Sequence, residues 1–297
     1  MSETEVSVVI AVRNEEKYIR EAIASVLNQN GVNHEVVVVD DNSTDNTYKI
    51  LEEISKENKN LKLYVNPNPG KSRAFNLGVS LATGNFVCLF AGDDIMPEGS
   101  LCKRWAIVSA EPNSANSVGL SKIKCMSTDK KFDGQIVPKK SGVGGFTGTS
   151  YLIGRNALNQ IFPVPESLPN EDSWMLYAVS MLPDVKVVHS DIISNYWRVH
   201  EGNSINMMVD FDTYNKKITP RMRAPYLFFE KFEKILTPEK RIKLLEEMKC
   251  EEKRIKGDIF GIMFTKLPFV EKLRFVSMSN SFFYNLRRNL FKLFSGW

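Results

Sequence analysis

The segment Glu35–Asp45 reads EVVVVDDNSTD and decides the fold class. Its four consecutive valines are typical of a strand that is buried on both faces of a parallel sheet. Val6–Val12 (VSVVIAV) has the same character, and each run ends in polar residues. Between the two runs, Glu15–Gln29 carries apolar side chains at helical spacing. The pattern therefore predicts a strand–helix–strand unit.

Strand and helix patterns continue to alternate through the first third of the chain. Further strands are expected at Leu61–Val65 and Phe86–Phe90, and helices at Thr44–Lys56 and Lys71–Leu81. This alternation predicts an α/β fold, with a mostly parallel, Rossmann-like sheet covered by helices on both faces. Ligands of such sheets bind at the carboxyl ends of the strands.

The second half of the chain is less regular. Strands are expected at Ser150–Ile153, Val185–Val188 and Ile192–Trp197, and a helix after Asn170. Later residues form a helical and charged pattern. We therefore predict an α/β domain over residues 1–210 and a helical C-terminal region over residues 211–297.

Composition limits the class of protein. The 297 residues are 43% apolar, enough for a sizeable core, and 39 basic against 35 acidic residues give a charge of +4. That charge is too small to indicate a nucleic-acid partner. The four cysteines lack metal-ligand spacing and are expected to be free thiols. With no basic signal-peptide start and no apolar run of about 20 residues, the sequence predicts a cytoplasmic protein.

Paired carboxylates follow two of the predicted strands. Asp40 and Asp41 follow the second strand, and Asp93 and Asp94 follow the fourth. Turn and helix-cap preferences explain the residues after Asp41 but do not explain two such pairs. Neighbouring like charges repel each other unless a cation or hydrogen-bond donors hold them. Because Mg²⁺ and Mn²⁺ bind one or two carboxylates together with substrate phosphates, Asp93 and Asp94 predict a divalent-metal site.

Together these segments resemble the inverting glycosyltransferases of family 2, which have the GT-A fold. The resemblance covers about the first third of the chain, and its combination of motifs is specific. The segments that carry it are Ser7–Glu15, Val36–Asp45, Gly70–Gly78, Gly84–Phe86 and Gly92–Asp94. One departure is Ala91, which stands where the family usually has the first aspartate of Asp-x-Asp-Asp.

The resemblance implies a nucleotide-sugar site at the strand ends. Asp41, with Asp40 beside it, would bind the donor nucleoside, most commonly uridine. Because a helix N-terminus with cations attracts anions, Lys71 and Arg73 suit the donor pyrophosphate, although a solvated first turn is the alternative. The other residues implied in donor binding are Arg13, Glu15, Asn76, Asp93 and Arg198.

The resemblance also extends to two motifs in the second half. Pro169–Trp174 is similar to the family's Glu-Asp motif, which would make Asp172 the general base that takes a proton from the acceptor hydroxyl. A helix-start acidic residue is the alternative. Tyr196–Ser204 is similar to a late Arg-x-His motif, so that His200 would join Asp93 and Asp94 at the metal or contact the diphosphate, and Arg198 would pair with phosphate.

Two further segments allow more than one interpretation. Gly142–Gly148 does not match a dinucleotide-binding motif, and is expected to be a loop over the donor or acceptor, or a linker. Trp174 is expected either in an acceptor platform or in the core. The C-terminal tail has the pattern of a basic amphipathic helix, which would lie on an anionic membrane or pack on the core or a second subunit. Its residues are Phe282, Leu286, Arg287, Arg288, Leu290, Lys292, Leu293 and Trp297.

These expectations describe a hexosyltransferase that uses Mn²⁺ or Mg²⁺ and a nucleotide-diphosphate sugar, commonly UDP-linked. The acceptor would be a saccharide or a lipid-linked saccharide of cell-surface polysaccharide or glycolipid synthesis, and the enzyme would be cytoplasmic or peripheral on the inner face of the membrane. A nucleotidyltransferase is one alternative, disfavoured because no Gly-rich loop follows the first strand. A non-catalytic sugar-nucleotide-binding protein is the other, which Ala91 keeps open. The sequence does not indicate an oligomeric state.

Overall fold

The chain forms two compact units in the computed structural model, which describes residues 4–130, 132–199 and 209–289. The first unit comprises residues 4–180 and 184–199, and the second comprises residues 181–183 and 209–289. Each has a hydrophobic core of its own. Residues 200–208 lie outside the described part, so the domain boundary at residue 210 stays a prediction.

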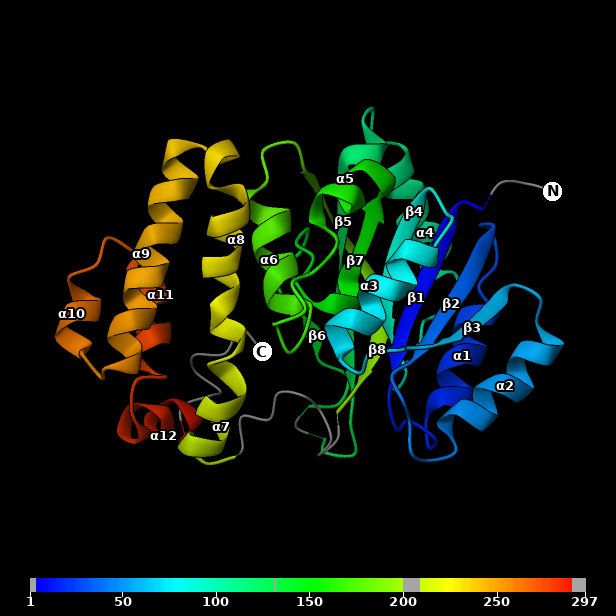
Figure 1. Ribbon diagram of the computed structural model, residues 1–297, viewed down its shortest axis with the longest axis horizontal. Helices are drawn as coiled ribbons and strands as arrows, with labels where there is room; N and C mark the ends of the chain where they lie inside the picture. Colours follow the sequence, from blue (N-terminus) through cyan, green and yellow to red (C-terminus); the bar gives the residue numbers. More distant parts are fainter. Residues whose placement is uncertain (1–3, 131, 200–208, 290–297) are drawn as a thin grey trace. The chain divides into compact units, whose positions relative to one another are not determined.

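A mixed, mostly parallel sheet is the frame of the first unit (Figure 1). Within the described residues it has eight strands in the order β3-β2-β1-β4-β7-β5-β6, with β8 paired to β5. Strands β1 to β4 are mutually parallel, β7 is antiparallel to β4 and to β5, and β8 is parallel to β5. The strands are β1 (Val6–Val12), β2 (His34–Asp40), β3 (Leu61–Val65), β4 (Phe86–Ala91), β5 (Ser117–Met126), β6 (Ile136–Val137), β7 (Tyr151–Gly154) and β8 (Lys186–Arg198).

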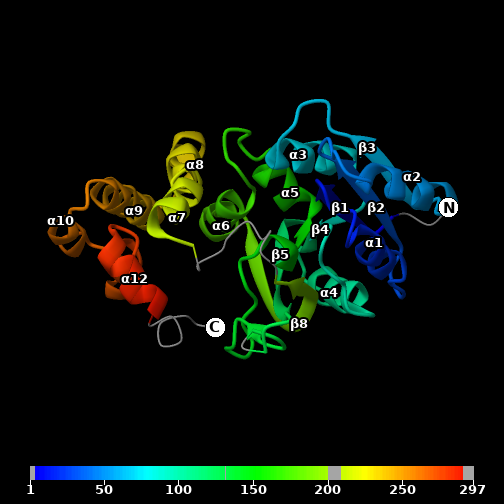
Figure 2. The same cartoon turned by 90° about the horizontal axis from the view of Figure 1, so that it is seen from below.

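Helices cover both faces of this sheet (Figure 2). Alternate residues of β1, such as Val8 and Ile10, share one core cluster with α1, α2 and α4. On the other face, α3 approaches so closely that a Cβ on Gly78 would lie 2.5 Å from Val9 Cγ1. The helices of this unit are α1 (Ile19–Leu27), α2 (Thr47–Glu57), α3 (Lys71–Leu81), α4 (Ser100–Ser109), α5 (Arg155–Ile161) and α6 (Asp172–Met181).

The sheet differs from the sequence prediction at β8. The two strands expected at Val185–Val188 and Ile192–Trp197 are one strand, and its pairing with β5 shifts register between Leu120 and Ile123. The residues between the two expected strands thus form an irregularity within a continuous strand. The prediction of two strands is wrong for that reason.

The second unit is helical, as the sequence predicts. Arg254 organises part of its interior: the guanidinium donates to both carboxylate oxygens of Glu251 at 2.7 Å, to Asn215 Oδ1 at 2.8 Å and to the Met278 carbonyl at 3.2 Å. None of the helices in the described ranges has the length and apolarity to cross a bilayer. The helices are α7 (Phe211–Ile218), α8 (Ala224–Phe232), α9 (Pro238–Ile255), α10 (Ile259–Met263), α11 (Phe269–Val276) and α12 (Ser281–Asn289).

Glu35, near the start of β2, ties three segments of the first unit together. Its carboxylate accepts hydrogen bonds from Ser7 Oγ, the Thr83 backbone nitrogen and Lys62 Nζ, each at 2.6 Å. Burial alone would raise the pKa of Glu35, but these donors outweigh it and lower the pKa to about 2. The ionised carboxylate is therefore a stabilising part of the fold.

We expect Glu35→Gln to reduce the free energy of unfolding by about 2 kcal/mol at neutral pH, because a buried charged acceptor is lost. Lys62 is partly exposed, so solvent screens its ion pair with Glu35 and that pair contributes only a small part of the free energy. Since the folded pKa of about 2 lies below the ordinary value of 4.5, this stability is present above pH 4.5 and is lost as pH falls towards 2. Urea unfolding of both proteins at neutral and acidic pH measures it. A difference that did not shrink in acid would contradict the prediction.

Candidate functional site

The carboxyl ends of β1 and β2 form two interlocked turns. Asn14 and Asn42 both have φ of 57°, a left-handed conformation that asparagine tolerates better than most residues. The Asn14 backbone nitrogen donates to Ser43 Oγ at 3.0 Å, and Thr44 donates from its backbone nitrogen to Asn14 Oδ1 at 2.8 Å. These bonds fix the backbone on either side of Arg13, which is exposed.

Asp40 and Asp41 are both buried beside these turns. Asp41 Oδ1 accepts hydrogen bonds from Asn66 Nδ2 at 2.7 Å and from the Gly70 backbone nitrogen at 2.8 Å. Asp40 Oδ2 accepts from the Ser43 nitrogen at 3.0 Å, whereas its buried Oδ1 has no partner among the described residues. A buried acceptor of this kind suits a ligand donor. Asn66 was not predicted, although its place directly after β3 puts it at the same sheet edge.

Asp93 has a carboxylate neighbour on each of two segments where β1 and β4 end, Glu15 and Asp94. Burial, followed by the charges of Asp93 and Asp45, raises the pKa of Glu15 to about 7. Burial and the charge of Asp93 also raise the pKa of Asp94 well above its ordinary value. A cation beside them would relieve this mutual repulsion. The structure thus places Glu15 and Asp94 each near Asp93, and their roles in metal and donor binding stay predictions.

The two neighbours Asp93 and Asp94 have different surroundings. Asp94 is 1% exposed; its Oδ1 accepts from the Arg198 backbone nitrogen at 2.9 Å and its Oδ2 from Asn195 Nδ2 at 2.6 Å. Both oxygens are therefore engaged in holding β8 to the turn after β4. Asp93 is only partly buried, and its backbone carbonyl accepts from Arg198 Nε at 2.8 Å.

Arg198 lies beside this cluster, at the end of β8. Its guanidinium also donates to Glu21 Oε2 at 2.7 Å and stacks 4.4 Å from the centre of the Tyr18 ring. His200, the third predicted metal ligand, lies outside the described residues. Within them, no three His, Cys, Asp or Glu side chains are grouped so as to hold a metal ion. A divalent ion held by Asp93 would therefore need substrate phosphate and water as further ligands.

A second acidic pair lies at the start of α6. Asn170 Nδ2 donates to Asp172 Oδ2 at 2.9 Å, and Lys71 Nζ, from the start of α3, lies 3.3 Å from Glu171 Oε1. Burial is the main cause that raises the pKa of the fully buried Glu171, opposed by Lys71 and reinforced by Asp172. Burial and these two carboxylates also raise the pKa of Tyr151. Lys71 is thus placed beside Glu171, which precedes the predicted base in the chain.

The Gly-rich segment ends against this pair. A Cβ on Gly148 would lie 2.7 Å from Asp172 Oδ1 and 3.0 Å from Glu171 Oε1, so only glycine fits without displacement. The next residue, Thr149, donates from its hydroxyl to Asn195 Oδ1 at 2.9 Å. Because Asn195 in turn binds Asp94, this connection links the α6 acidic pair to the strand-end cluster. Neither Thr149 nor Asn195 was predicted.

Three other residues singled out in the sequence have structural partners. Arg73 Nε pairs with Glu166 Oε2 at 2.9 Å on the surface. The Asn76 side-chain amide makes two 2.8 Å hydrogen bonds to the backbone of Val164, one as donor and one as acceptor. Trp174 is fully buried and donates to the Ile161 carbonyl at 2.8 Å. Trp174 therefore belongs to the core, and the donor-binding roles of Arg73 and Asn76 stay predictions.

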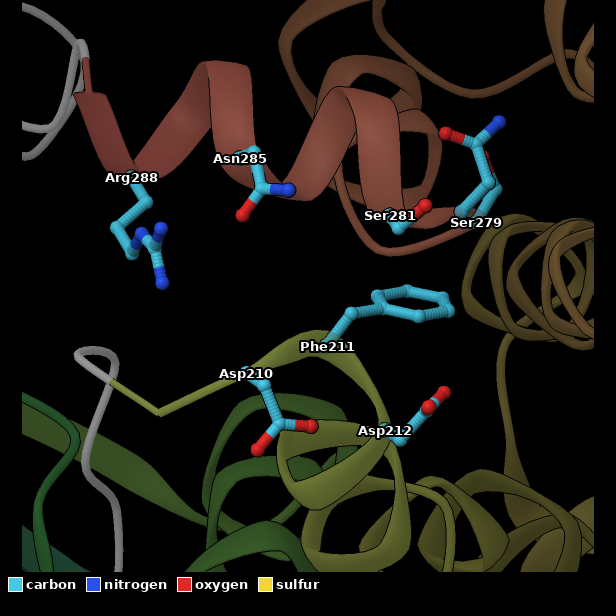
Figure 3. A pocket seen from close by; sticks show the side chains of 8 residues that line it. Asp210, Phe211, Asp212, Ser279, Ser281, Asn285 and Arg288 are labelled. Atoms are coloured by element: carbon cyan, nitrogen blue, oxygen red, sulfur yellow. The ribbon is translucent and has the colours of Figure 1, made fainter.

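The helical unit contains a pocket of about 590 Å³ (Figure 3). Two of its polar side chains cap helices: Asp210 Oδ1 accepts from the Thr213 nitrogen at 2.9 Å, and Asn280 Oδ1 accepts from the Phe283 nitrogen at 3.0 Å. Capping accounts for these groups, and none of the predicted site residues lines the pocket. Its lining residues are Asp210, Phe211, Asp212, Ser279, Asn280, Ser281, Asn285 and Arg288.

Comparison with known proteins identifies the family of this chain. Residues 7–163, more than half of the chain, match the family model described as glycosyl transferase family 2. The chain belongs to glycosyl transferase family 2. The prediction of a family 2 glycosyltransferase is thereby confirmed, and the nucleotidyltransferase alternative loses its support.

Curated relatives of this family 2 member include an uncharacterized glycosyltransferase of Haemophilus influenzae, 32% identical over 136 residues, which are 43% of this chain and 54% of the relative. A second is the Methanococcus voltae dolichyl N-acetyl-α-D-glucosaminyl phosphate 3-β-D-2,3-diacetamido-2,3-dideoxy-β-D-glucuronosyltransferase. It is 34% identical over 217 residues, which are 72% of this chain and 53% of the relative. The chain spans about half the length of both relatives.

Solved structures confirm the GT-A type of fold for the family 2 chain. TarS of S. aureus superposes with a TM-score of 0.62 at 21% identity, over 93% of this chain and 48% of TarS. The mannosyltransferase PcManGT of Pyrobaculum calidifontis, solved with GDP-Man and Mn²⁺, gives 0.59 at 15% identity, over 98% and 88% of the two chains. At such identities the likeness concerns the fold.

Proposed function

We propose that this family 2 member is an inverting hexosyltransferase that moves a sugar from a nucleoside-diphosphate sugar to an acceptor hydroxyl with the help of a divalent cation. The observation that carries the proposal is the placement of Glu15 and Asp94 near Asp93 at the carboxyl ends of β1 and β4, together with the buried Asp41 directly after β2. Structures of TarS with UDP-GlcNAc and of PcManGT with GDP-Man support a nucleotide-sugar donor, and the second of them also supports Mn²⁺.

The donor nucleoside is assigned to the turn after β2. Asp41 is held rigidly by Asn66 and Gly70, and the buried Oδ1 of Asp40 is available as an acceptor for a ligand N–H or hydroxyl. Arg13 is exposed on the neighbouring turn, where its charge suits the diphosphate. A UDP-linked sugar is the donor that the family resemblance favours.

The cation is assigned to Asp93, with Glu15 beside it. Asp94 is given a different role, because both of its oxygens already accept hydrogen bonds from β8. Asp94 thus positions Asp93 and Arg198, and His200 remains a further predicted ligand. When bound, Mn²⁺ or Mg²⁺ supplies charge neutralisation for the departing nucleoside diphosphate.

Asp172 is assigned as the general base. It lies in the first turn of α6, and the hydrogen bond from Asn170 Nδ2 fixes the orientation of its carboxylate. As the acceptor oxygen bonds to the anomeric carbon, Asp172 takes the hydroxyl proton, and the bond from that carbon to the diphosphate oxygen breaks. Attack from the side opposite the leaving group inverts the anomeric centre.

The acceptor is proposed to be a saccharide or lipid-linked saccharide of cell-surface polysaccharide or glycolipid synthesis. The Methanococcus voltae relative, whose name describes a dolichyl-phosphate-linked sugar as acceptor, supports this class. An enzyme with such an acceptor would work in the cytoplasm, peripherally at the inner face of the membrane. A non-catalytic sugar-nucleotide-binding protein is the second candidate, which Ala91 in place of an aspartate favours.

A donor screen tests the proposal. The purified protein is incubated with UDP-, GDP- and dTDP-sugars in the presence of Mn²⁺, Mg²⁺ or EDTA, and release of the nucleoside diphosphate is measured. We expect release from one donor that EDTA abolishes. Calorimetry on the same panel separates the candidates: tight binding without turnover, even with an acceptor mixture, would favour the non-catalytic binder, and no binding of any donor would refute both.

A further inference from the structure

Four large apolar side chains are strongly exposed on α10 and α11. Phe260 is 81% exposed, Phe264 87%, Phe269 62% and Val270 66%. Phe264 directly follows α10 in a helical conformation, four residues after Phe260, so the two side chains lie on the same face. Lys272 Nζ of α11 donates to the Met263 carbonyl at 2.9 Å, so the two helices are joined. Single exposed apolar side chains are common, but a group of them marks an interaction surface.

The fold of the helical unit does not need these four side chains. The inner sides of α10 and α11 are filled by Ile262, Leu267, Phe275 and Val276, which pack around Cys250 of α9. The helices are therefore amphipathic with their core face complete, and the outer aromatic rings contribute nothing to that core. We call the outer set, Phe260, Phe264, Phe269 and Val270, the α10–α11 face.

The chain around the α10–α11 face is basic. Residues 255–289 contain six Lys and Arg, none of them buried, but only two Asp and Glu. The run IFGIMFT over residues 259–265 has no charged residue and is flanked by exposed Lys256 and Lys266. The two acids are paired, Asp258 with Lys253 at 3.0 Å and Glu271 with Lys243 at 3.5 Å.

We infer that the α10–α11 face docks on an anionic lipid bilayer. Phe260 and Phe264 enter the boundary between headgroups and acyl chains, and Lys256 and Lys266 contact lipid phosphates at their side. A second copy of the chain fits less well, because a symmetric contact would bring the two basic rims together. The inference deepens the peripheral location of the proposed function, and it assigns the contact to α10–α11, not to the tail beyond residue 289.

Vesicle co-sedimentation of the full chain tests the inference. The vesicles are phosphatidylcholine alone or phosphatidylcholine with phosphatidylglycerol, at low and high salt. We expect binding to the anionic vesicles only, and weaker binding at high salt. Phe260→Gln with Phe264→Gln should weaken it by about 100-fold. Lys256→Gln with Lys266→Gln should weaken it by about 30-fold, and the corresponding arginine pair should preserve it.

Ile107→Gln with Ile235→Gln is the matched control, since it also removes two exposed apolar side chains, one in α4 and one just before α9. Equal binding by the control and the phenylalanine pair would overturn the inference. The inference would also be overturned if removal of residues 290–297 abolished vesicle binding while the phenylalanine pair still bound like the parent protein. A third contrary result would be a dimer mass for the parent protein in light scattering that the phenylalanine pair reduced to that of a monomer. Donor binding by the same variants should equal that of the parent protein. Failure of the donor screen would therefore count against the proposed function, and failure of the vesicle assay would count against the inference.

Discussion

Asp172→Asn is expected to reduce sugar transfer by roughly 10²- to 10⁴-fold while donor affinity stays close to that of the parent protein. The substitution removes a proton acceptor and leaves a side chain of the same shape, whose oxygen can still accept from Asn170 Nδ2. Nucleoside-diphosphate release in the presence of acceptor measures the loss, and calorimetry with the donor measures affinity.

A stability measurement separates this role from a structural one. Asp172 raises the pKa of the buried Glu171, so that removing its charge relieves a repulsion. We therefore expect the Tm of Asp172→Asn to be equal to or above that of the parent protein. Asp184→Asn, an exposed acid just after α6, is the matched control and should retain full activity. Full transfer by Asp172→Asn would show that Asp172 is not the base and would turn attention to Glu171.

The sequence predicts the fold well where elements that follow one another in the chain also pack against one another. Strands β1 to β4 are short and rich in apolar residues, and helices α1 and α2 between them bury an apolar face. β5 was not predicted, because its Lys122 is buried and compensated by Asp191, 2.8 Å away on β8. Such a pairing depends on a strand about seventy residues later in the chain.

Some residues of the candidate site could likewise be predicted from the sequence, and others could not. Carboxylates that directly follow apolar strands, such as Asp41 and Asp93, can be predicted because the sheet edge alone brings them together. Asn195 could not be predicted: it is a neutral amide within a strand and belongs to no motif. Its role arises from the pairing of β8 with β5 and from the bridge between Ile95 and Tyr196, which place it against Asp94.

Asp93→Asn is expected to reduce metal-dependent turnover by about 10³-fold, because it removes the carboxylate proposed to hold the cation against the leaving diphosphate. The affinity for Mn²⁺ in the presence of nucleoside diphosphate should fall in parallel, and Tm should change little, since Asp93 is partly exposed. Turnover at saturating Mn²⁺ and calorimetric titration of the ion measure both effects. Unchanged Mn²⁺ affinity would contradict the assignment.

Asp94→Asn, alone and combined with a second substitution, distinguishes a positioning role of Asp94 from a role in cation binding. An amide at position 94 can still accept from the Arg198 nitrogen, but its NH₂ group then faces the NH₂ group of Asn195, so the single variant should lose both Tm and activity. In Asp94→Asn with Asn195→Asp the donor and acceptor are exchanged, and the new carboxylate still accepts from Thr149 and Ser194. If Asp94 only positions its neighbours, the exchange restores stability together with most of the activity. If Asp94 binds the cation, the exchange restores stability alone, because the charge has moved one side chain away from the cluster.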